Sequence, residues 1–149
     1  MELKSRLEDQ LKNAMRKKDD VRKNALRMAL SSIKLAEVEQ RKALDEALII
    51  SILQKEIKTR EETITEARNA NRPEMIAPIE AEILVLKEFL PAELSDSELR
   101  DLLEKIIDQT GATSIKEMGA VMKAAIAEVA GRASNDRVSK MIRELLPNP

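Results

Sequence analysis

Apolar residues return at every third or fourth position along most of the chain, which is the spacing that places them on one face of an α-helix. The pattern begins with Leu3, Leu7 and Leu11 and recurs in segment after segment. Only three Gly and five Pro residues interrupt 149 positions, and turn-bounded runs of β-branched or aromatic residues are missing. The sequence therefore predicts an all-α fold. Because Phe89 is the single aromatic residue, its core must be aliphatic, as in helix bundles.

The first part of the chain predicts a four-helix unit with acidic residues as N-terminal caps, since a carboxylate accepts hydrogen bonds from the first free amides of a helix. The four helices are expected from Leu3 to near Lys18, from a cap at Asp19 or Asp20, from a cap at Asp45 to about Ala67, and over residues 74–90. The fourth helix tolerates Pro78 only if this residue lies in its first turn.

The second of these helices has apolar residues on two sides, which predicts a central position in the bundle. Its inward stripe is expected to be Ala25, Met28, Ala29, Ser32, Leu35 and Ala36, with Leu26, Leu30 and Ile33 on the other apolar side. By the same periodicity, Met15 in the first helix and Leu48 in the third should also face inward.

The segment from Leu90 to Ser95 is the expected domain boundary, because Pro91 disfavours helical geometry in the residue before it. We therefore predict an N-terminal helical domain over residues 1–91 and a small three-helix domain over residues 92–149. Its helices are expected from a capping box at Ser95 and Glu98 to Gly111, from a second capping box at Ser114 and Glu117 to near Gly131, and from a cap at Ser134 or Asn135 to Pro147.

The middle helix of this second domain has two notable features. Gly119 lies within the helical pattern, where glycine is less favourable than alanine by about 1 kcal/mol, and this cost suggests close approach of a helix or a ligand to the backbone. Methionine suits both irregular cores and adaptable partner surfaces, and the stripe positions favour core packing. The residues concerned are Met118, Met122 and Met141, with Ile126 on the same stripe as the first two.

The side chains that most often carry out acid, base or nucleophilic chemistry are missing, since the chain has no His, Cys, Tyr or Trp. This composition excludes hydrolase triads, cysteine nucleophiles and the usual structural zinc sites. The three glycines are scattered, so no phosphate-binding loop exists. We predict no catalytic residue, no metal and no cofactor.

A charged N-terminus and the lack of any apolar stretch of roughly 18 residues predict a cytoplasmic protein with no membrane span.

Charge is unevenly distributed along the chain. Residues 1–42 carry twelve bases and seven acids, residues 74–104 carry two bases and nine acids, and residues 105–149 carry seven bases and five acids. Lys23, Arg27, Lys34 and Arg41 recur at helical spacing and form a basic edge on the second helix. Such an edge is favourable for phosphate, but a solvated face is the commoner role and no aromatic residue lies between the bases for stacking.

Short stretches in a specific order make the chain resemble the GatB/YqeY family over nearly its whole length. They are Ala14-Met15-Arg16-Lys17-Lys18-Asp19, Leu26-Arg27-Met28, Ile33-Lys34, Lys55-Glu56-Ile57-Lys58-Thr59-Arg60, Phe89-Leu90-Pro91, Leu94-Ser95, Gly111-Ala112, Met118-Gly119-Ala120-Val121-Met122-Lys123 and Gly131-Arg132-Ala133. In that family the helical unit occurs alone and as the C-terminal, tRNA-gripping extension of the B subunit of the glutamine-dependent aspartyl/glutamyl-tRNA amidotransferase. The chain departs from the family pattern at Phe89, where Tyr is usual, and at Ala120, where many members have Lys.

The resemblance implies that the small C-terminal domain contacts tRNA. The implied contact residues are Gly119, Lys123, Gly131, Arg132 and Ala133, to which we add Arg137, Lys140 and Arg143 as nearby bases on the last helix. The leading hypothesis is a non-catalytic tRNA or RNA-binding accessory module. One alternative is a helical protein-interaction module that docks an amidotransferase or other translation-related subunit. Another, implied by the family alone, is participation in a carbon-nitrogen ligase with glutamine as amido-N-donor. The oligomeric state stays open.

Overall fold

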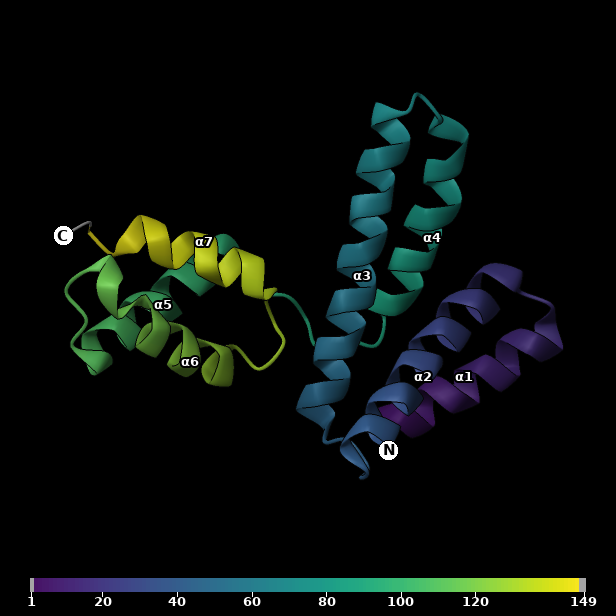
Figure 1. Ribbon diagram of the computed structural model, residues 1–149, viewed down its shortest axis with the longest axis horizontal. Coiled ribbons are helices and arrows are strands. Elements are labelled where there is room, and N and C mark those ends of the chain that lie inside the picture. The colour runs from purple at the N-terminus through teal and green to yellow at the C-terminus, as the bar shows by residue number, and fades with distance from the viewer. Residues whose placement is uncertain (1, 148–149) are drawn as a thin grey trace. The chain divides into compact units, whose positions relative to one another are not determined.

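The computed structural model describes residues 2–147 and builds them into seven α-helices and two short 3-10 turns, with no strand within that range (Figure 1). The predicted all-α class is therefore confirmed. The chain clusters into two compact units, one ending at Leu90 and the other beginning at Pro91. That each unit folds as a separate domain stays a prediction.

Four helices make the first unit, and α2 packs against the other three. The helices are α1 (Leu3–Lys17), α2 (Asp20–Gln40), α3 (Glu46–Asn69) and α4 (Ile76–Lys87), with a 3-10 turn at Pro73–Met75 before α4. In Figure 1, α1 runs beside α2 and α3 runs beside α4. The predicted central position of the second helix is confirmed.

The N-terminal caps of α2 and α3 are formed by aspartates that the sequence predicts. The Asp19 carboxylate accepts a hydrogen bond from the Arg22 amide at 3.2 Å, and the Asp45 carboxylate accepts one from the Leu48 amide at 2.9 Å. At their C-terminal ends, α1 and α2 close with Lys18 at φ 57° and Arg41 at φ 56°. Both residues adopt the left-handed conformation that glycine usually supplies at this position.

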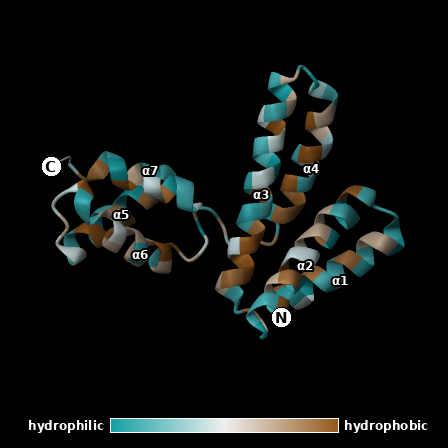
Figure 2. Cartoon of the chain, in the orientation of Figure 1, coloured by the Kyte–Doolittle hydropathy of each residue, from teal (hydrophilic) through white to brown (hydrophobic). Residues whose placement is uncertain are grey.

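The core of the first unit is aliphatic apart from the buried Phe89, with Leu7, Leu26 and Leu53 fully buried, and Figure 2 shows apolar residues where the helices face one another. The prediction of an inward-facing side chain is wrong for four residues, which are exposed. They are Met15, Met28, Leu35 and Leu48. The helix α2 is apolar around much of its circumference, but its neighbours cover only the side with Ala25, Leu26, Ala29 and Ile33, so Met28 and Leu35 reach solvent.

The α3–α4 hairpin differs from the expected boundaries. The helix α3 continues to Asn69, two residues past the predicted end, and the α-helical part of the fourth segment covers Ile76–Lys87 in place of 74–90. Pro73 opens a 3-10 turn, which delays the start of α4. Pro78 lies in the first turn of α4 as predicted, where its missing amide hydrogen needs no partner.

Three helices make the second unit, and each packs against the other two. They are α5 (Asp96–Thr110), α6 (Met118–Val129) and α7 (Asn135–Leu145), with a 3-10 turn at Ile115–Glu117 before α6. The predicted capping box at Ser95 and Glu98 is confirmed, as are the left-handed Gly111 at φ 73° and the Ser134 cap, whose hydroxyl accepts from the Arg137 amide at 3.2 Å.

The second predicted capping box, at Ser114, is wrong. The 3-10 turn moves the start of α6 to Met118, so the Ser114 side chain does not reach the free amides of that helix and makes no cap hydrogen bond. Instead, the Thr113 hydroxyl donates to the Glu117 carboxylate at 3.2 Å. A spacing of Ser and Glu alone therefore does not fix a helix start.

The core of the second unit is entirely apolar and includes Leu99, Leu103, Val121 and Ile142, all fully buried. Met141 is buried, and Met118 and Met122 pack against this core partly buried, which confirms the preference for core packing. Ile126 was expected on the same stripe but is 44% exposed, because Val121, Ala125 and Val129 form the face of α6 that meets its neighbours.

Candidate nucleic-acid interface

All eight residues predicted to contact RNA lie on α6, on α7 or on the segment that joins them. Gly119 and Lys123 belong to α6, and Gly131, Arg132 and Ala133 belong to the connection. Arg137, Lys140 and Arg143 lie on α7. The structure thus places the predicted residues on one helix pair and its connection, but their surroundings divide them into four groups.

Gly119 lies in the first turn of α6 and is exposed. A Cβ atom built at this position meets no heavy atom within 4 Å. The predicted close approach of another helix is therefore wrong. The backbone here is open, so a side chain at this position would be accommodated without rearrangement.

The α6–α7 connection is fixed by its own backbone. Ala130 at φ 50° and Gly131 at φ 82° both adopt left-handed conformations, which reverses the chain after α6. The Arg132 carbonyl then accepts a hydrogen bond from the Leu94 amide at 2.8 Å. Ala133 is only 4% exposed, so its side chain belongs to the core and has no surface for a ligand.

Two of the predicted bases bind carbonyl groups of their own chain. The Arg132 guanidinium donates to the Val129 carbonyl at 3.0 Å and to the Glu128 carbonyl at 2.9 Å. These carbonyls belong to the last turn of α6, whose acceptors have no partner within the helix. Arg137 donates to the Leu94 carbonyl at 3.0 Å and to the Asp96 carboxylate at 2.9 Å. Both arginines therefore stabilise the junction of α5, α6 and α7.

Glu98 adds a negative charge to the same junction. The Ser95 backbone amide donates to its carboxylate at 3.0 Å, and this hydrogen bond lowers the pKa of Glu98, with smaller contributions from the Ser95 hydroxyl and the charge of Arg132. Glu98 is therefore ionised at neutral pH, and it reduces the positive charge that Arg132 presents to solvent.

The remaining three bases, Lys123, Lys140 and Arg143, are exposed. None of them makes an ion pair with another residue in the described range 2–147. Of the eight predicted residues, these three are the ones whose charge is both accessible and not neutralised by a neighbour. The sequence alone does not separate them from Arg132 and Arg137, because all five bases look alike in a periodic pattern.

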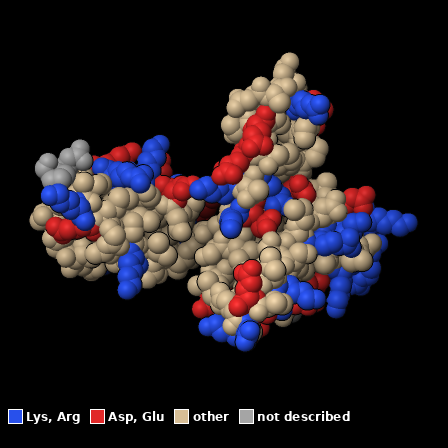
Figure 3. All heavy atoms as spheres, in the orientation of Figure 1, with Lys and Arg blue, Asp and Glu red and all other residues tan. Residues whose placement is uncertain are grey.

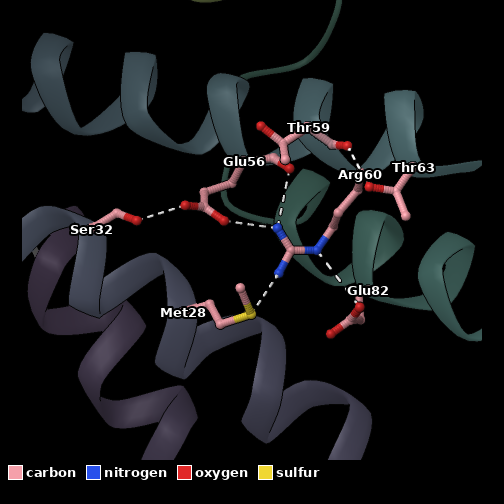
Figure 4. A network of polar contacts seen from close by, with 7 residues as sticks. All are labelled: Met28, Ser32, Glu56, Thr59, Arg60, Thr63 and Glu82. Atoms are coloured by element: carbon pink, nitrogen blue, oxygen red, sulfur yellow. Dashed lines mark hydrogen bonds and ion pairs between the residues drawn. The ribbon is translucent and has the colours of Figure 1, made fainter.

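The first unit holds a polar cluster that the sequence analysis missed (Figure 4). Among the described residues, Arg60 of α3 is the one charged residue that is buried. Its guanidinium donates to the Glu56 carboxylate at 2.8 Å, approaches the Glu82 carboxylate of α4 at 3.7 Å and donates to the Met28 sulfur of α2 at 3.5 Å. The Ser32 hydroxyl of α2 donates to Glu56 at 2.6 Å.

This cluster joins three helices through one guanidinium. The signal for it was present in the sequence, because Arg60 occupies a position of the α3 stripe between Ile57 and Ile64, where an apolar residue is expected. Its Nε atom has no hydrogen-bond partner within the described residues. A buried arginine between two carboxylates organises helix packing, since it neither releases a proton nor acts as a nucleophile.

One further recess in the first unit has a volume of about 440 Å³ and lies between α1, the start of α2 and the segment after α4. Its polar groups already contact one another: Arg22 donates to Glu88 at 2.7 Å and to Gln10 at 3.1 Å, and the Arg6 guanidinium lies 5.5 Å above the Phe89 ring. These contacts engage Arg6, Arg22 and Glu88, and the other charged residue of the lining is the exposed Asp9.

Fold and surface together define an all-α protein of two helical units, whose accessible side-chain chemistry is dominated by charge. No helix in the described part of the chain is long and apolar enough to cross a membrane. The chain belongs to the YqeY-like protein family, whose model matches residues 4–146.

Its relatives include three fungal proteins, each named "Altered inheritance of mitochondria protein 41, mitochondrial". The protein of Pyrenophora tritici-repentis is 30% identical over 147 residues, covering 95% of this chain and 79% of that protein. The protein of Lachancea thermotolerans is 33% identical over 119 residues, covering 74% and 63%. The protein of Saccharomyces cerevisiae strain YJM789 is 29% identical over 131 residues, covering 85% and 68%. The chain thus spans less than two thirds of the Lachancea relative.

Proposed function

We propose that this protein is a non-catalytic RNA-binding accessory module that contacts the backbone of tRNA through its second unit. The observation that carries the proposal is the set of three exposed bases without ion pairs, Lys123, Lys140 and Arg143, on the two helices that hold the predicted contact residues. Lys and Arg bind phosphate oxygens without reading sequence, which suits recognition of RNA by shape. The cytoplasm is the proposed location.

The other predicted bases have a supporting role in this proposal. Arg132 and Arg137 hold the α5–α6–α7 junction through carbonyl groups and thereby fix the helices that carry the three contact bases. Replacement of either arginine would weaken RNA binding indirectly, through the fold. We assign the chain no step of a carbon-nitrogen ligase reaction, because it has no His, Cys or Tyr for proton transfer or nucleophilic attack.

The test is titration of the full chain with a tRNA transcript at several salt concentrations. A variant with Lys123→Gln, Lys140→Gln and Arg143→Gln should bind more weakly. The slope of log K against log salt should fall by about 2 to 3, at about 0.7 to 0.9 for each lost phosphate contact. The matched control, Arg100→Gln with Lys105→Gln and Lys116→Gln, removes three exposed bases from the same unit and should retain most of the affinity.

Two results would contradict the proposal. The first is a wild-type protein without measurable tRNA affinity at about 50 mM salt, where phosphate contacts are strong. The second is an equal loss in the triple variant and its control, which would mean that total charge alone sets the affinity. Circular dichroism of both variants verifies that the helices are intact.

A second candidate function, docking of an amidotransferase or other translation-related subunit, is favoured by a different observation. Met28, Leu35 and Val38 lie exposed along α2, at 54%, 61% and 67%, and the basic edge with Arg27 and Lys34 lies on the same helix. Exposed apolar residues in a row are typical of protein contacts. A Met28→Ser, Leu35→Ser, Val38→Ser variant that loses binding to a purified amidotransferase but keeps its tRNA affinity would support docking over RNA binding.

A further inference from the structure

A concentration of positive charge lies at the turn between α1 and α2, far along the chain from the RNA-contact residues proposed above. We define the α1–α2 tip as Lys12, Arg16, Lys17 and Lys18, all of which are exposed. In Figure 3, Lys and Arg atoms gather over this turn at the edge of the first unit.

The charges of the tip are not neutralised within the described residues. Some other bases of this unit do have a carboxylate partner: Lys4 contacts Glu37 at 2.8 Å, and Arg22 contacts Glu88 at 2.7 Å. The two acids nearest the tip in sequence are engaged, since Asp19 caps α2 and Asp20 contacts Lys23 at 3.5 Å. None of the four tip residues makes an ion pair within residues 2–147.

The helix geometry concentrates these charges. Lys12 and Arg16 lie one turn apart on the solvent side of α1, where side chains spaced by four residues are neighbours. Lys17 ends the helix, and Lys18 turns away in the left-handed conformation. Four cationic side chains therefore occupy about 9 Å along one helix end, at 1.5 Å per residue. A nucleic-acid backbone is a ligand of comparable charge density, with about one negative charge per 1.7 Å in a duplex.

We propose that the α1–α2 tip is a second RNA-backbone contact, distinct from the α6–α7 surface. The proposal rests on the RNA-binding function proposed above and adds a surface in the other unit. An anionic membrane is another polyanionic surface in a cell, but a helix that binds membranes presents an apolar face to the lipid. The apolar face of α1, with Leu3 and Leu7, is buried in the core, and Met15 is the exposed apolar residue beside the tip.

The experiment compares two full-chain variants that remove equal charge. The tip variant carries Lys12→Gln, Arg16→Gln, Lys17→Gln and Lys18→Asn. The edge variant carries Arg27→Gln, Lys34→Gln, Arg41→Asn and Lys42→Gln, four exposed bases from the same unit. Each set includes one left-handed helix end, at φ 57° or φ 56°, where asparagine is tolerated, so the backbone effects are matched.

Both variants are titrated with a tRNA transcript across salt concentrations and with vesicles of phosphatidylcholine and phosphatidylglycerol. The tip variant should lose about 3 from the slope of log K against log salt, at about 0.7 to 0.9 for each phosphate contact, and the edge variant should lose less than 1. Circular dichroism and thermal unfolding of the two variants establish that both are folded.

Distinct results separate this inference from the function on which it rests. If tRNA binding depends on Lys123, Lys140 and Arg143 but the tip variant binds like wild type, the tip proposal is overturned and the RNA-binding function stands. Equal losses in the tip and edge variants overturn it as well, and so does a tip variant that loses vesicle binding alone. A wild-type chain without tRNA affinity overturns both proposals.

Discussion

The two helical units use arginine in opposite ways. In the first unit, Arg60 is buried between Glu56 and Glu82 and joins three helices from the inside. In the second unit, the core is apolar throughout, and Arg132 and Arg137 bind backbone carbonyls at its edge. The first arrangement joins α2, α3 and α4, which have 21, 24 and 12 residues, whereas the second contains helices of 15, 12 and 11 residues.

We attribute this difference to the length of α2 and α3, the two longest described helices. Short helices are marginal by themselves, and a large fraction of their backbone groups lies in the unpaired end turns. Side chains that satisfy those ends, such as Ser95, Ser134 and Arg132, therefore matter most in the second unit. Long helices have proportionally fewer free ends and gain more from contacts between their flanks. Five changes test this comparison, from the largest expected effect to the smallest.

The largest effect should come from a cavity in the smaller core. Leu103→Ala removes a fully buried side chain and should destabilise the second unit by about 2 to 5 kcal/mol. Amide hydrogen exchange should then accelerate in α5, α6 and α7 and stay unchanged in α1 to α4. The reciprocal variant, Leu53→Ala, should accelerate exchange in the first unit only. Acceleration in both units by either change would mean that the chain unfolds as one cooperative domain.

Loss of the buried guanidinium should have the next largest effect. Arg60→Met leaves the Glu56 and Glu82 carboxylates, which are mostly buried, without their common partner and should cost about 2 kcal/mol in urea unfolding. A variant that also carries Glu56→Leu and Glu82→Leu should recover most of this stability, because no charge is then left unpaired. An Arg60→Met protein as stable as wild type would show that Arg60 does not organise the first unit.

Two serine positions in the second unit allow a matched pair of variants. Ser95→Ala removes a capping box and should lower the free energy of unfolding by about 1 kcal/mol. Ser114→Ala changes the same residue type at the start of the next helical segment, where no cap hydrogen bond exists, and should have almost no effect. Chemical denaturation of both variants provides the measurement. Similar losses at the two serines would contradict the role assigned to the capping box.

Gly119→Ala should stabilise the second unit by about 0.5 to 1 kcal/mol. A Cβ at this position meets no atom within 4 Å, and alanine favours the helix because it restricts the unfolded chain. Thermal unfolding measures the change, and tRNA titration of the same variant tests whether a ligand approaches the bare backbone. A destabilised variant would indicate that α6 packs more closely here than its open surroundings suggest.

The smallest effect concerns pH. The pKa of Glu98 is lowered in the folded state by the Ser95 amide, so its contribution to stability is complete above the ordinary pKa of a glutamate and disappears as pH falls through the lowered value. Glu98→Gln keeps a capping side chain but does not titrate. The stability difference between wild type and this variant should be constant near neutral pH and shrink in acid. A difference that grows on acidification would reverse the assigned sign.

The sequence predicts most of the helices because the apolar period and the caps are local signals. Asp19, Asp45, Ser95 and Ser134 act as caps where the pattern placed them. Ser114 does not, since a 3-10 turn at Ile115–Glu117 precedes α6, and a spacing rule does not contain such a turn. The exposure of a residue is less predictable than its helical conformation. An apolar stripe indicates which residues share a helix face, but it does not indicate which neighbouring helices cover that face. Met28, Leu35 and Ile126 are therefore exposed despite their periodic positions.

The candidate site is predictable only in outline. Family resemblance pointed to residues on α6 and the connection, and the α7 bases were added because they lie nearby, but their periodicity gave no reason to distinguish Arg137 from Arg143. The first binds Leu94 and Asp96, 43 and 41 positions earlier in the chain, whereas the second is exposed. Arg60 was missed for a related reason: a base on an apolar stripe is interpretable only when the carboxylates around it are known.

At the left-handed ends of α1 and α2, the backbone conformation favours glycine, whereas the residues present, Lys18 and Arg41, are bases. Glycine at 18 or 41 would relieve about 1 kcal/mol of backbone strain at each helix end, but it would also delete a cation. We expect a library randomised at both positions and sorted for thermal resistance to enrich glycine. Sorting of the same library for RNA retention should instead preserve the base at 18 and accept glycine at 41. Divergent enrichment at these two sites would identify which of the two charges contributes to RNA retention at a cost in backbone strain.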